Sequence, residues 1–365
     1  MPVESGVTMS LAPYMEWAKT RPAARFDLAG SNVLACSLDD LEGAAGALDL
    51  SGHNDNGYQP LVEAIAGRYG VSPEQVATAQ GTSGANFQVC AALLKAGDDV
   101  LVERPGYDPL LAAPRLLNAR VLRFDRDRAA GYALDPDRVR AAMTPRTKLI
   151  IVTNSHNPTG AVADSGNLRA IGELAASAGA SVIVDEVYLD VADSGAPAAA
   201  LLGDVFISTS SLTKAYGLAA LRCGWSVSAP AIAERIRRAR DVIDGTGSIV
   251  TERLSVLAFA QLDRLHRRAT ALLAANRTLV REFLEGRREL EWFDPQRGTV
   301  VFPRLPGVED TDRFAERLMS ELGVAVVPGR FFEAPAHFRL GLGGATESLG
   351  GGLAAIGSAL DARAW

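Results

Sequence analysis

The sequence predicts an α/β protein whose large domain holds a mostly parallel sheet flanked by helices, joined to a smaller α+β domain. Through the middle of the 365-residue chain, short apolar runs with strand character alternate with segments of helical spacing such as 165–179. Continuous apolar strands that alternate with helices are typical of a parallel sheet covered on both faces. We expect strands at residues 99–103, 119–124, 148–153, 181–185 and 204–208.

The last third of the chain has a different pattern. Residues 251–290 form one stretch of helical spacing, which is too long for a single ordinary helix without a bend or a join. It is followed by strand-like runs at 298–302 and 337–340 and by helical runs at 312–321 and 353–360. We therefore predict a large domain over residues 36–250 and a small domain formed by residues 1–35 together with 251–365.

Composition narrows the classes of partner. An apolar share of 48% supports a substantial core, and a net charge of −6 gives no reason to expect nucleic acid or an anionic membrane. The basic run 234–240 has the spacing of a solvated helix face. Residues 1–10 lack a basic region followed by an apolar stretch, so we expect a cytoplasmic protein.

Neither a disulfide framework nor a metal site is expected. The three cysteines, Cys36, Cys90 and Cys223, are far apart and form no CxxC pair. Cys90 lies in an apolar helical run, which favours a place in the core. His53 and His337 have no metal-spaced cluster around them and are interpreted as structural or solvated.

Lys214 is the most informative residue. The 37 Lys and Arg residues include only four lysines: Lys19, Lys95, Lys148 and Lys214. Lys214 follows the expected strand 204–208 and is flanked by hydroxyls and small residues, which suits Schiff-base chemistry with a carbonyl cofactor. A solvated surface lysine is the ordinary alternative. Arg222, eight residues later, is suited to gripping a phosphate.

Three further segments bear on this choice. Gly81-Thr82-Ser83-Gly84-Ala85 opens an apolar helix, whose free N–H groups would favour phosphate, although such residues also cap helices for structural reasons. Residues 154–160 follow an expected strand, where α/β folds bind ligands, but could form a simple turn. Asp185 ends another strand and needs a partner, either a protonated ring nitrogen or a structural arginine.

Together these segments resemble the pyridoxal-phosphate-dependent aminotransferases of class I/II, the aspartate-aminotransferase-like fold-type I superfamily. The resemblance covers roughly Asp27 to Leu340, and its most specific motifs are Asn157-Pro158-Thr159-Gly160, Asp185-Glu186-Val187-Tyr188 and residues 211–225, in that order. It implies pyridoxal 5'-phosphate as cofactor, an amino acid and a 2-oxo acid as substrates, and a homodimer with shared active sites.

The resemblance also implies roles for individual residues. Lys214 would form the aldimine with the cofactor and carry the substrate proton, and Asp185 would pair with the ring nitrogen. Arg339, in Phe338-Arg339-Leu340-Gly341, would bind the substrate carboxylate with backbone near Gly30, and Asn157 would also contact the substrate. The remaining implied cofactor contacts are Asn157 and Tyr188 at the phenolic oxygen, Tyr107 on the ring face, Thr82, Ser83, Ser211 and Arg222 at the phosphate, and Tyr58 at the phosphate of the neighbouring subunit.

Two departures from the family pattern concern the substrate. Ser155 stands where the asparagine loop usually has its first proline, and His156 beside it is a conceivable but disfavoured substrate contact. Residues 29–32 lack the usual Gly-x-Pro-Asp pattern of the segment that closes over the substrate. Arg21 and Arg25 could bind a second carboxylate, although a solvated role is the favoured interpretation.

The sequence leaves the reaction open. Transamination is the leading hypothesis. The same cofactor geometry also supports β-elimination, decarboxylation, racemisation or a cyclising synthase reaction. A non-catalytic sensor protein with the same fold is disfavoured because Lys214, Asp185, Arg222 and Arg339 are all present.

Overall fold

The computed structural model describes residues 12–192 and 195–363, and its centre is a seven-stranded sheet of order β2-β8-β7-β6-β5-β3-β4. From β7 to β4 all neighbouring strands are parallel, whereas β8 runs antiparallel to both β7 and β2. The predicted α/β fold with a mostly parallel sheet is confirmed. The strands are β2 (Val76–Gln80), β3 (Asp99–Arg104), β4 (Arg120–Asp125), β5 (Thr147–Thr153), β6 (Ser181–Asp185), β7 (Phe206–Ser211) and β8 (Cys223–Val227).

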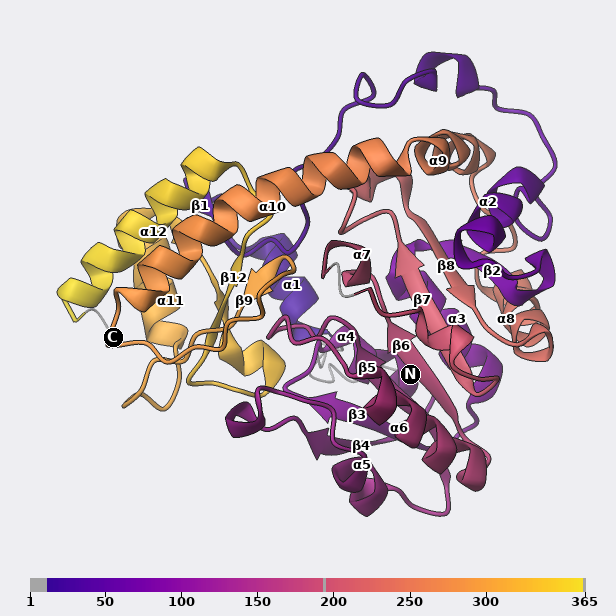
Figure 1. Cartoon of the computed structure of the whole chain (residues 1–365), viewed down its shortest axis with the longest axis horizontal. Helices are drawn as coiled ribbons and strands as arrows, with labels where there is room; N and C mark the ends of the chain where they lie inside the picture. Colours follow the sequence, from indigo (N-terminus) through magenta and orange to yellow (C-terminus); the bar gives the residue numbers. More distant parts are fainter. Residues whose placement is uncertain (1–11, 193–194, 364–365) are drawn as a thin grey trace, which may run out of the picture.

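Helices cover both faces of this sheet (Figure 1). Val100 and Val102 of β3 belong to a buried cluster with α3 (Gly81–Leu93), α4 (Pro109–Leu116) and α8 (Pro230–Ile243), and Cys90 lies in this cluster as predicted. Leu101, between them, belongs to a cluster on the other face with α5 (Pro136–Ala142) and α6 (Ser165–Ala178). Successive side chains of a strand point to opposite faces, so continuous apolar strands are buried on both sides.

The predicted long helical stretch is two helices with a join. They are α9 (Ile249–Ala260) and α10 (Leu262–Glu285), and Gln261 between them departs from helical geometry with φ −119° and ψ 14°. The Gln261 side chain accepts a hydrogen bond from the backbone N–H of Glu42 at 3.2 Å and donates to the Glu42 carbonyl at 3.0 Å. The join is therefore attached to the N-terminal segment of the chain.

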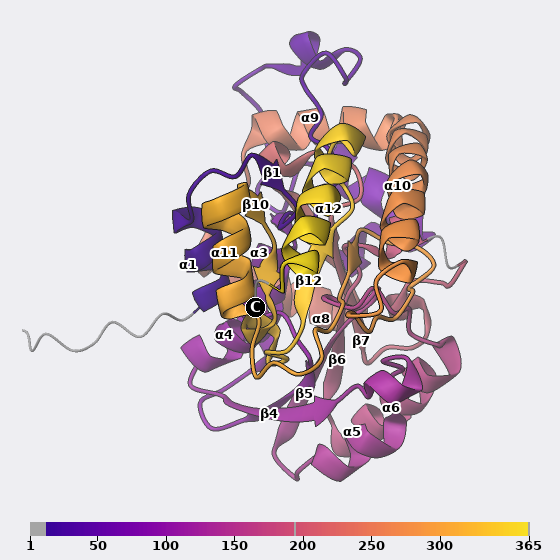
Figure 2. The ribbon, with the colours of Figure 1, turned by 90° about the vertical axis from the view of Figure 1, so that its left-hand side faces the viewer.

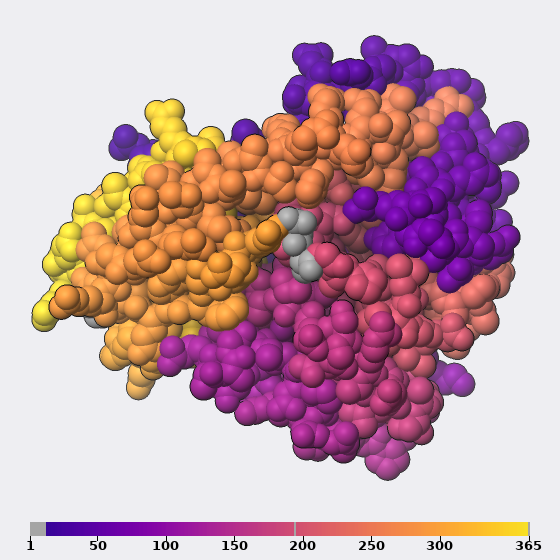
Figure 3. All heavy atoms as spheres, viewed as in Figure 1, coloured from indigo at the N-terminus to yellow at the C-terminus, as the bar shows by residue number. Residues whose placement is uncertain are grey.

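A smaller lobe gathers the two ends of the described chain (Figures 2 and 3). Its strands pair as β1 with β10, in parallel, and as β11-β12-β9, antiparallel. We propose that it is the predicted small domain, although α10 contacts both α12 of this lobe and α7 (Leu189–Ala192) of the larger one. Its elements are α1 (Pro13–Thr20), β1 (Phe26–Asp27), β9 (Val300–Val301), α11 (Asp312–Leu322), β10 (Val324–Ala325), β11 (Val327–Pro328), β12 (Phe338–Gly341) and α12 (Thr346–Asp361).

The glycine run lies within α12 rather than in a loop. A Cβ atom at Gly351 would lie 2.5 Å from Cε1 of Phe26, and one at Gly352 would lie 2.5 Å from Cδ1 of Leu28. Glycine therefore allows α12 to pack closely on β1, at the usual cost in helix propensity.

The prediction of a fully solvated basic face on α8 is wrong at one position. Arg240 is only 2% exposed, and its Nη1 donates to Oγ1 of Thr78 at 2.9 Å. Its Nη2 lies 3.9 Å from a carboxylate oxygen of Glu252 on α9, which supplies the countercharge that a buried guanidinium needs.

The remaining helices are short or lie at the edge of the sheet. A 310 segment is the tighter relative of an α-helix and serves here as a connector. The remaining helices are α2 (Gln59–Tyr69) and the 310 helices Ala44–Ala47, Pro73–Gln75, Arg128–Ala130, Ala199–Leu201, Ala219–Leu221 and Gly329–Phe332.

Candidate active site

A cavity of about 260 Å³ opens at the carboxyl ends of β5, β6 and β7, beside the start of α3. This is the edge where α/β sheets bind ligands. Nine of the twelve predicted site residues line it: Thr82, Ser83, Tyr107, Asn157, Asp185, Tyr188, Ser211, Lys214 and Arg222. The other lining residues are Met15, Asn32, Asn86, Pro109, Leu110, Ala113, Thr153, Val187, Thr213 and Ala219.

The part of the cavity beside the start of α3 has the features of an anion site. The hydroxyl of Thr82 donates to Oγ of Ser211 at 2.9 Å, at the first turn of α3. The first N–H groups of a helix have no partner within it and carry partial positive charge. Gly81 has φ +70°, and a Cβ there would collide with the Arg222 guanidinium, so glycine brings that cation against the helix start. These donors fit a phosphate group.

Asp185 lines the same cavity at the point where β6 stops. Its Oδ2 accepts from Nδ2 of Asn86 at 2.9 Å, and its Oδ1 accepts from the N–H of Val187 at 3.2 Å. Thr209 donates to Oδ1 of Asn86 at 2.6 Å, which orients that amide. Burial raises the pKa of Asp185 to about 6, against the opposing effect of these bonds and of Lys214. A cationic ring nitrogen beside the carboxylate would restore its ionised form.

Lys214 also lines this cavity. Its Nζ donates to Oγ of Ser31 at 3.1 Å and lies 5.9 Å from the centre of the Tyr188 ring. Burial lowers the pKa of Lys214 to about 8, with repulsion from Arg339 and Arg222 acting in the same direction. The lowered pKa increases the fraction of neutral amine, the form that attacks a carbonyl, near neutral pH.

Arg339 does not line this cavity. It is fully buried on β12, where Nη1 donates to Oδ1 of Asn157 at 2.8 Å. Its Nη2 donates to the hydroxyl of Tyr14 and to the carbonyl of Ala29, each at 2.9 Å. Tyr14 belongs to α1, so the N-terminal helix covers the predicted carboxylate anchor. Its Nε has no hydrogen-bond partner among the described residues, which leaves the guanidinium with unused donor capacity.

The other predicted site residues lie at the margins. The carbonyl of Gly30 packs directly against Gly341, where a Cβ would collide with it. The N–H of Tyr58 donates to Oε2 of Glu252 at 3.1 Å, away from the cavity. Their roles in binding substrate and the neighbouring subunit's cofactor stay predictions.

Three residues weighed as second substrate contacts have other partners. His156 is buried, with Nδ1 2.6 Å from Oγ1 of Thr159 and Nε2 2.9 Å from the carbonyl of Pro105. Arg21 pairs with Asp27 at 2.6 Å, and Arg25 lies over the ring of Phe26. None of the three lines the cavity.

Sequence reasoning missed several residues of the site. Asn86 is a polar residue at the start of an apolar helical run, and this contrast was the available signal. Tyr14, Met15 and Ser31 come from the N-terminal segment, which approaches the cavity only through tertiary packing.

Fold and site together define an enzyme that binds pyridoxal 5'-phosphate. The sequence model of the family "Aminotransferase class I and II" matches residues 37–356, and the chain belongs to that family. Pyridoxal 5'-phosphate is therefore its cofactor, and the chain is a pyridoxal-phosphate-dependent transferase.

Individual relatives differ in their reactions. The chain is 30% identical to capreomycidine synthase from Streptomyces vinaceus, over 97% of this chain and 94% of that protein. A pyridoxal-phosphate-dependent aminotransferase from Streptococcus suis has a TM-score of 0.90 at 27% identity, covering 96% and 97% of the two chains. The pyridoxal-phosphate-dependent cyclase OrfR has a TM-score of 0.86 at 27% identity, with the same coverage.

Among residues 12–192 and 195–363, no helix has both the length and the apolar character needed to span a membrane.

Proposed function

We propose that the protein is an aminotransferase that moves an amino group between an L-amino acid and a 2-oxo acid. The observation that carries the proposal is the position of Lys214, an amine with a lowered pKa that shares one cavity with Asp185 and with the phosphate-type donors of α3. Transamination needs an amine that can be deprotonated, an electron-withdrawing cofactor and a grip on the substrate carboxylate.

The residues divide into holding and reacting groups. Thr82, Ser83, Ser211 and Arg222 would bind the phosphate, and Asp185 the ring nitrogen. Asn157 and Tyr188 would contact the phenolic oxygen, with Tyr107 over the ring. When bound, the cofactor supplies a reactive aldehyde and a ring that withdraws electrons.

Lys214 would perform the proton transfer. Its Nζ would take the proton from the substrate α-carbon and return one within the same cavity. Arg339 would fix the substrate carboxylate and so orient that carbon, with Tyr14 yielding its place on Nη2. The Arg339–Asn157 hydrogen bond would link the carboxylate anchor to the cofactor site.

The half-reaction tests the proposal. The loaded protein is mixed with single L-amino acids in the absence of any oxo acid, and the absorbance spectrum and released products are followed. An aminotransferase converts the bound cofactor to pyridoxamine phosphate and releases one equivalent of 2-oxo acid. A cofactor that stays in its aldehyde form while ammonia or CO2 accumulates would instead identify a lyase or a decarboxylase.

A cyclising synthase reaction is the second candidate. It is supported by the likeness to capreomycidine synthase over nearly the whole of both chains and by the fold of the cyclase OrfR. The same experiment separates the two functions, because a cyclase forms a ring product from the amino acid and leaves the cofactor unconsumed over many turnovers.

We also propose that the protein works as a homodimer. An N-terminal arm, residues 34–57, extends over one end of the large lobe (Figure 1) and exposes Leu34, Leu38, Leu48 and Leu50, the last at 83%. Such a run of exposed leucines favours a protein interface. Tyr58 follows the arm directly, as expected of a residue that reaches the neighbouring site. Light scattering at micromolar concentration should give a dimer, and a fully active monomer would contradict the proposal.

A further inference from the structure

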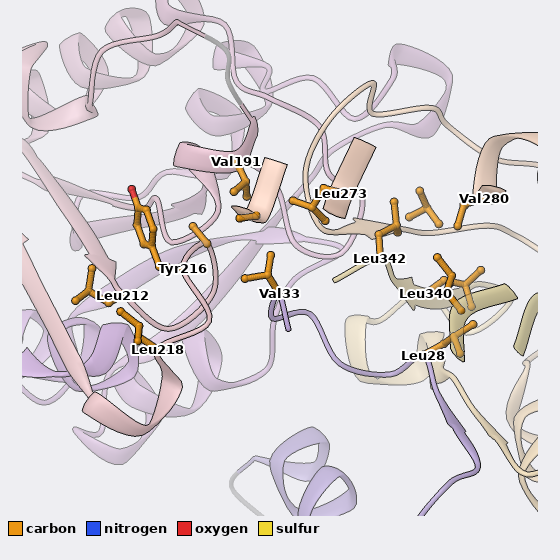
Figure 4. Close-up of a cluster of buried hydrophobic side chains, with 14 of the residues drawn as sticks. Leu28, Val33, Val191, Leu212, Tyr216, Leu218, Leu273, Val280, Leu340 and Leu342 are labelled. Atoms are coloured by element: carbon orange, nitrogen blue, oxygen red, sulfur yellow. The ribbon is translucent and has the colours of Figure 1, made fainter. Parts of the chain in front are cut away.

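The segment 29–33 joins the carboxylate anchor to the reactive lysine. At one end the carbonyl of Ala29 accepts from Nη2 of Arg339 at 2.9 Å. At the other end the N–H of Val33 donates to the carbonyl of Lys214 at 3.0 Å. Figure 4 shows the Val33 side chain between Leu218, four residues after Lys214, and Leu342, which follows β12. All three side chains belong to one buried cluster. Both ends of this short segment are therefore fixed, and the residue in its middle has little freedom.

Ser31 is that middle residue, and its side chain contacts both Lys214 and Tyr188. Its Oγ accepts from Nζ of Lys214 at 3.1 Å and from the hydroxyl of Tyr188 at 2.9 Å. Ser31 is only 4% exposed. A serine hydroxyl accepts two hydrogen bonds and can still donate its own hydrogen, so both contacts can exist together.

We propose that Ser31 is a positioning residue for Lys214. The hydroxyl of Ser31 holds the amine of Lys214 beside Tyr188 while that amine gains and loses the substrate proton. This inference rests on the function proposed above. The ammonium formed when Nζ takes the proton from the α-carbon donates to Oγ of Ser31. The neutral amine, present before Nζ takes the proton and again after Nζ has passed it on, accepts from the Ser31 hydroxyl. No proton is gained or lost overall.

A hydroxyl in this place affects the charge of Lys214. The charged and titratable groups facing the amine are Tyr14, Asp185, Tyr188, Arg222 and Arg339. Two of them are cations that oppose protonation, so an uncharged acceptor at contact distance favours the ammonium form. Removing it should lower the pKa of Lys214 further.

The first test measures that pKa in the cofactor-free protein. Lysine labelled with 13C at Cε gives only four resonances, from Lys19, Lys95, Lys148 and Lys214, and a Lys214→Arg sample identifies the last. Ser31→Ala should lower the pKa of Lys214 by about one or more, because the bond removed is to a charged group. Ser31→Thr, which keeps the hydroxyl, should restore it. An unchanged pKa in Ser31→Ala overturns the proposal.

The second test measures the half-reaction of the loaded protein with the amino acid that wild type converts. Ser31→Ala should slow conversion about tenfold at saturating amino acid. The amino acid concentration that gives half the maximal rate should change by less than about twofold. The isotope effect from α-deuterated substrate should be larger than in wild type. Equal rates and isotope effects in wild type and Ser31→Ala would overturn the inference. A wild-type protein that converts no amino acid refutes the proposed function instead, and the lysine titration still decides the role of Ser31.

Two controls separate the role of Ser31 from general effects of substitution in both tests. Ser177→Ala removes a hydroxyl from the exposed face of α6, far from the cavity, and should change neither readout. Thermal unfolding checks that each variant folds. Should Ser31→Ala fail to fold, Ser31→Gly also removes the hydroxyl, and the same fall in the pKa of Lys214 is expected.

Discussion

Replacing Asp185 with asparagine should stabilise the cofactor-free protein at alkaline pH, although the same change should damage the enzyme. Burial raises the pKa of Asp185 from an ordinary value of 3.8 to about 6. An acid with a raised pKa binds its proton more tightly in the folded state than in the unfolded state. Folding is therefore opposed by its ionisation above pH 6, and this penalty fades as the pH falls from 6 towards 4.

The size of the effect follows from the two pKa values. A difference of about two in pKa corresponds to about 3 kcal/mol. Asparagine has the shape of the protonated acid, and both need an acceptor where Asn86 now donates. Thr209 can reverse its hydrogen bond to Asn86 and allow that amide to turn in either case. The free energy of unfolding of Asp185→Asn should thus exceed that of wild type by about 3 kcal/mol at pH 8, and by almost nothing at pH 4.

Urea unfolding at fixed protein concentration measures this difference. Wild type and Asp185→Asn are compared at pH 4, 6 and 8, so that the titration of every other group cancels between them. With pyridoxal phosphate added at pH 8, wild type should instead be the more stable of the two proteins. The variant has no carboxylate to pair with the ring nitrogen, so it gains less stability from the cofactor. A variant that is less stable than wild type without cofactor, or equally destabilised at all three pH values, would refute the reasoning.

Three other substitutions test the proposed roles of single residues. Lys214→Ala should abolish turnover and the cofactor link that borohydride makes permanent, and a borohydride-stable label on the variant, detected by mass spectrometry, would contradict the assignment. Gly81→Ala should weaken pyridoxal phosphate binding at least about tenfold in a fluorescence titration, because φ is +70° and the new methyl displaces Arg222. Arg339→Lys should raise KM for the amino acid about 30-fold or more through loss of the guanidinium fork, and an unchanged KM would exclude Arg339 as the anchor.

Much of the large sheet could be predicted because its strands are marked locally. β6 has the predicted ends, since a Val-Ile-Val run is bounded by Gly179 on one side and by two acids on the other. β2 and β8 were not predicted, because Val-Ala-Thr-Ala-Gln and Cys-Gly-Trp-Ser-Val have little strand preference of their own. Gly224 of β8 has a tertiary cause, as a Cβ there would collide with the backbone of Gly81.

In the candidate site, too, the residues with a local sequence signal could be predicted, and those placed by tertiary packing could not. Asp185 ends one predicted strand and Lys214 follows another, and parallel strands bring their carboxyl ends together, so the meeting of these two residues could be foreseen. The hydrogen bond between Tyr14 and Arg339 joins residues 325 positions apart and has no local signal. Ser31 lies in the segment that departs from the family pattern, so the motif that revealed the rest of the site could not reveal it.

The join at Gln261 gives the long helix α10 the mechanics of a lever. A helix of 24 residues is about 36 Å long, so a rotation of about 5° at the join would carry its far end through about 3 Å. The far end packs on α12, while the pivot is bonded to Glu42 in the exposed N-terminal arm. A molecule bound to the arm would therefore contact the chain next to this join, where a small rotation becomes a larger displacement of the lobe that carries Arg339.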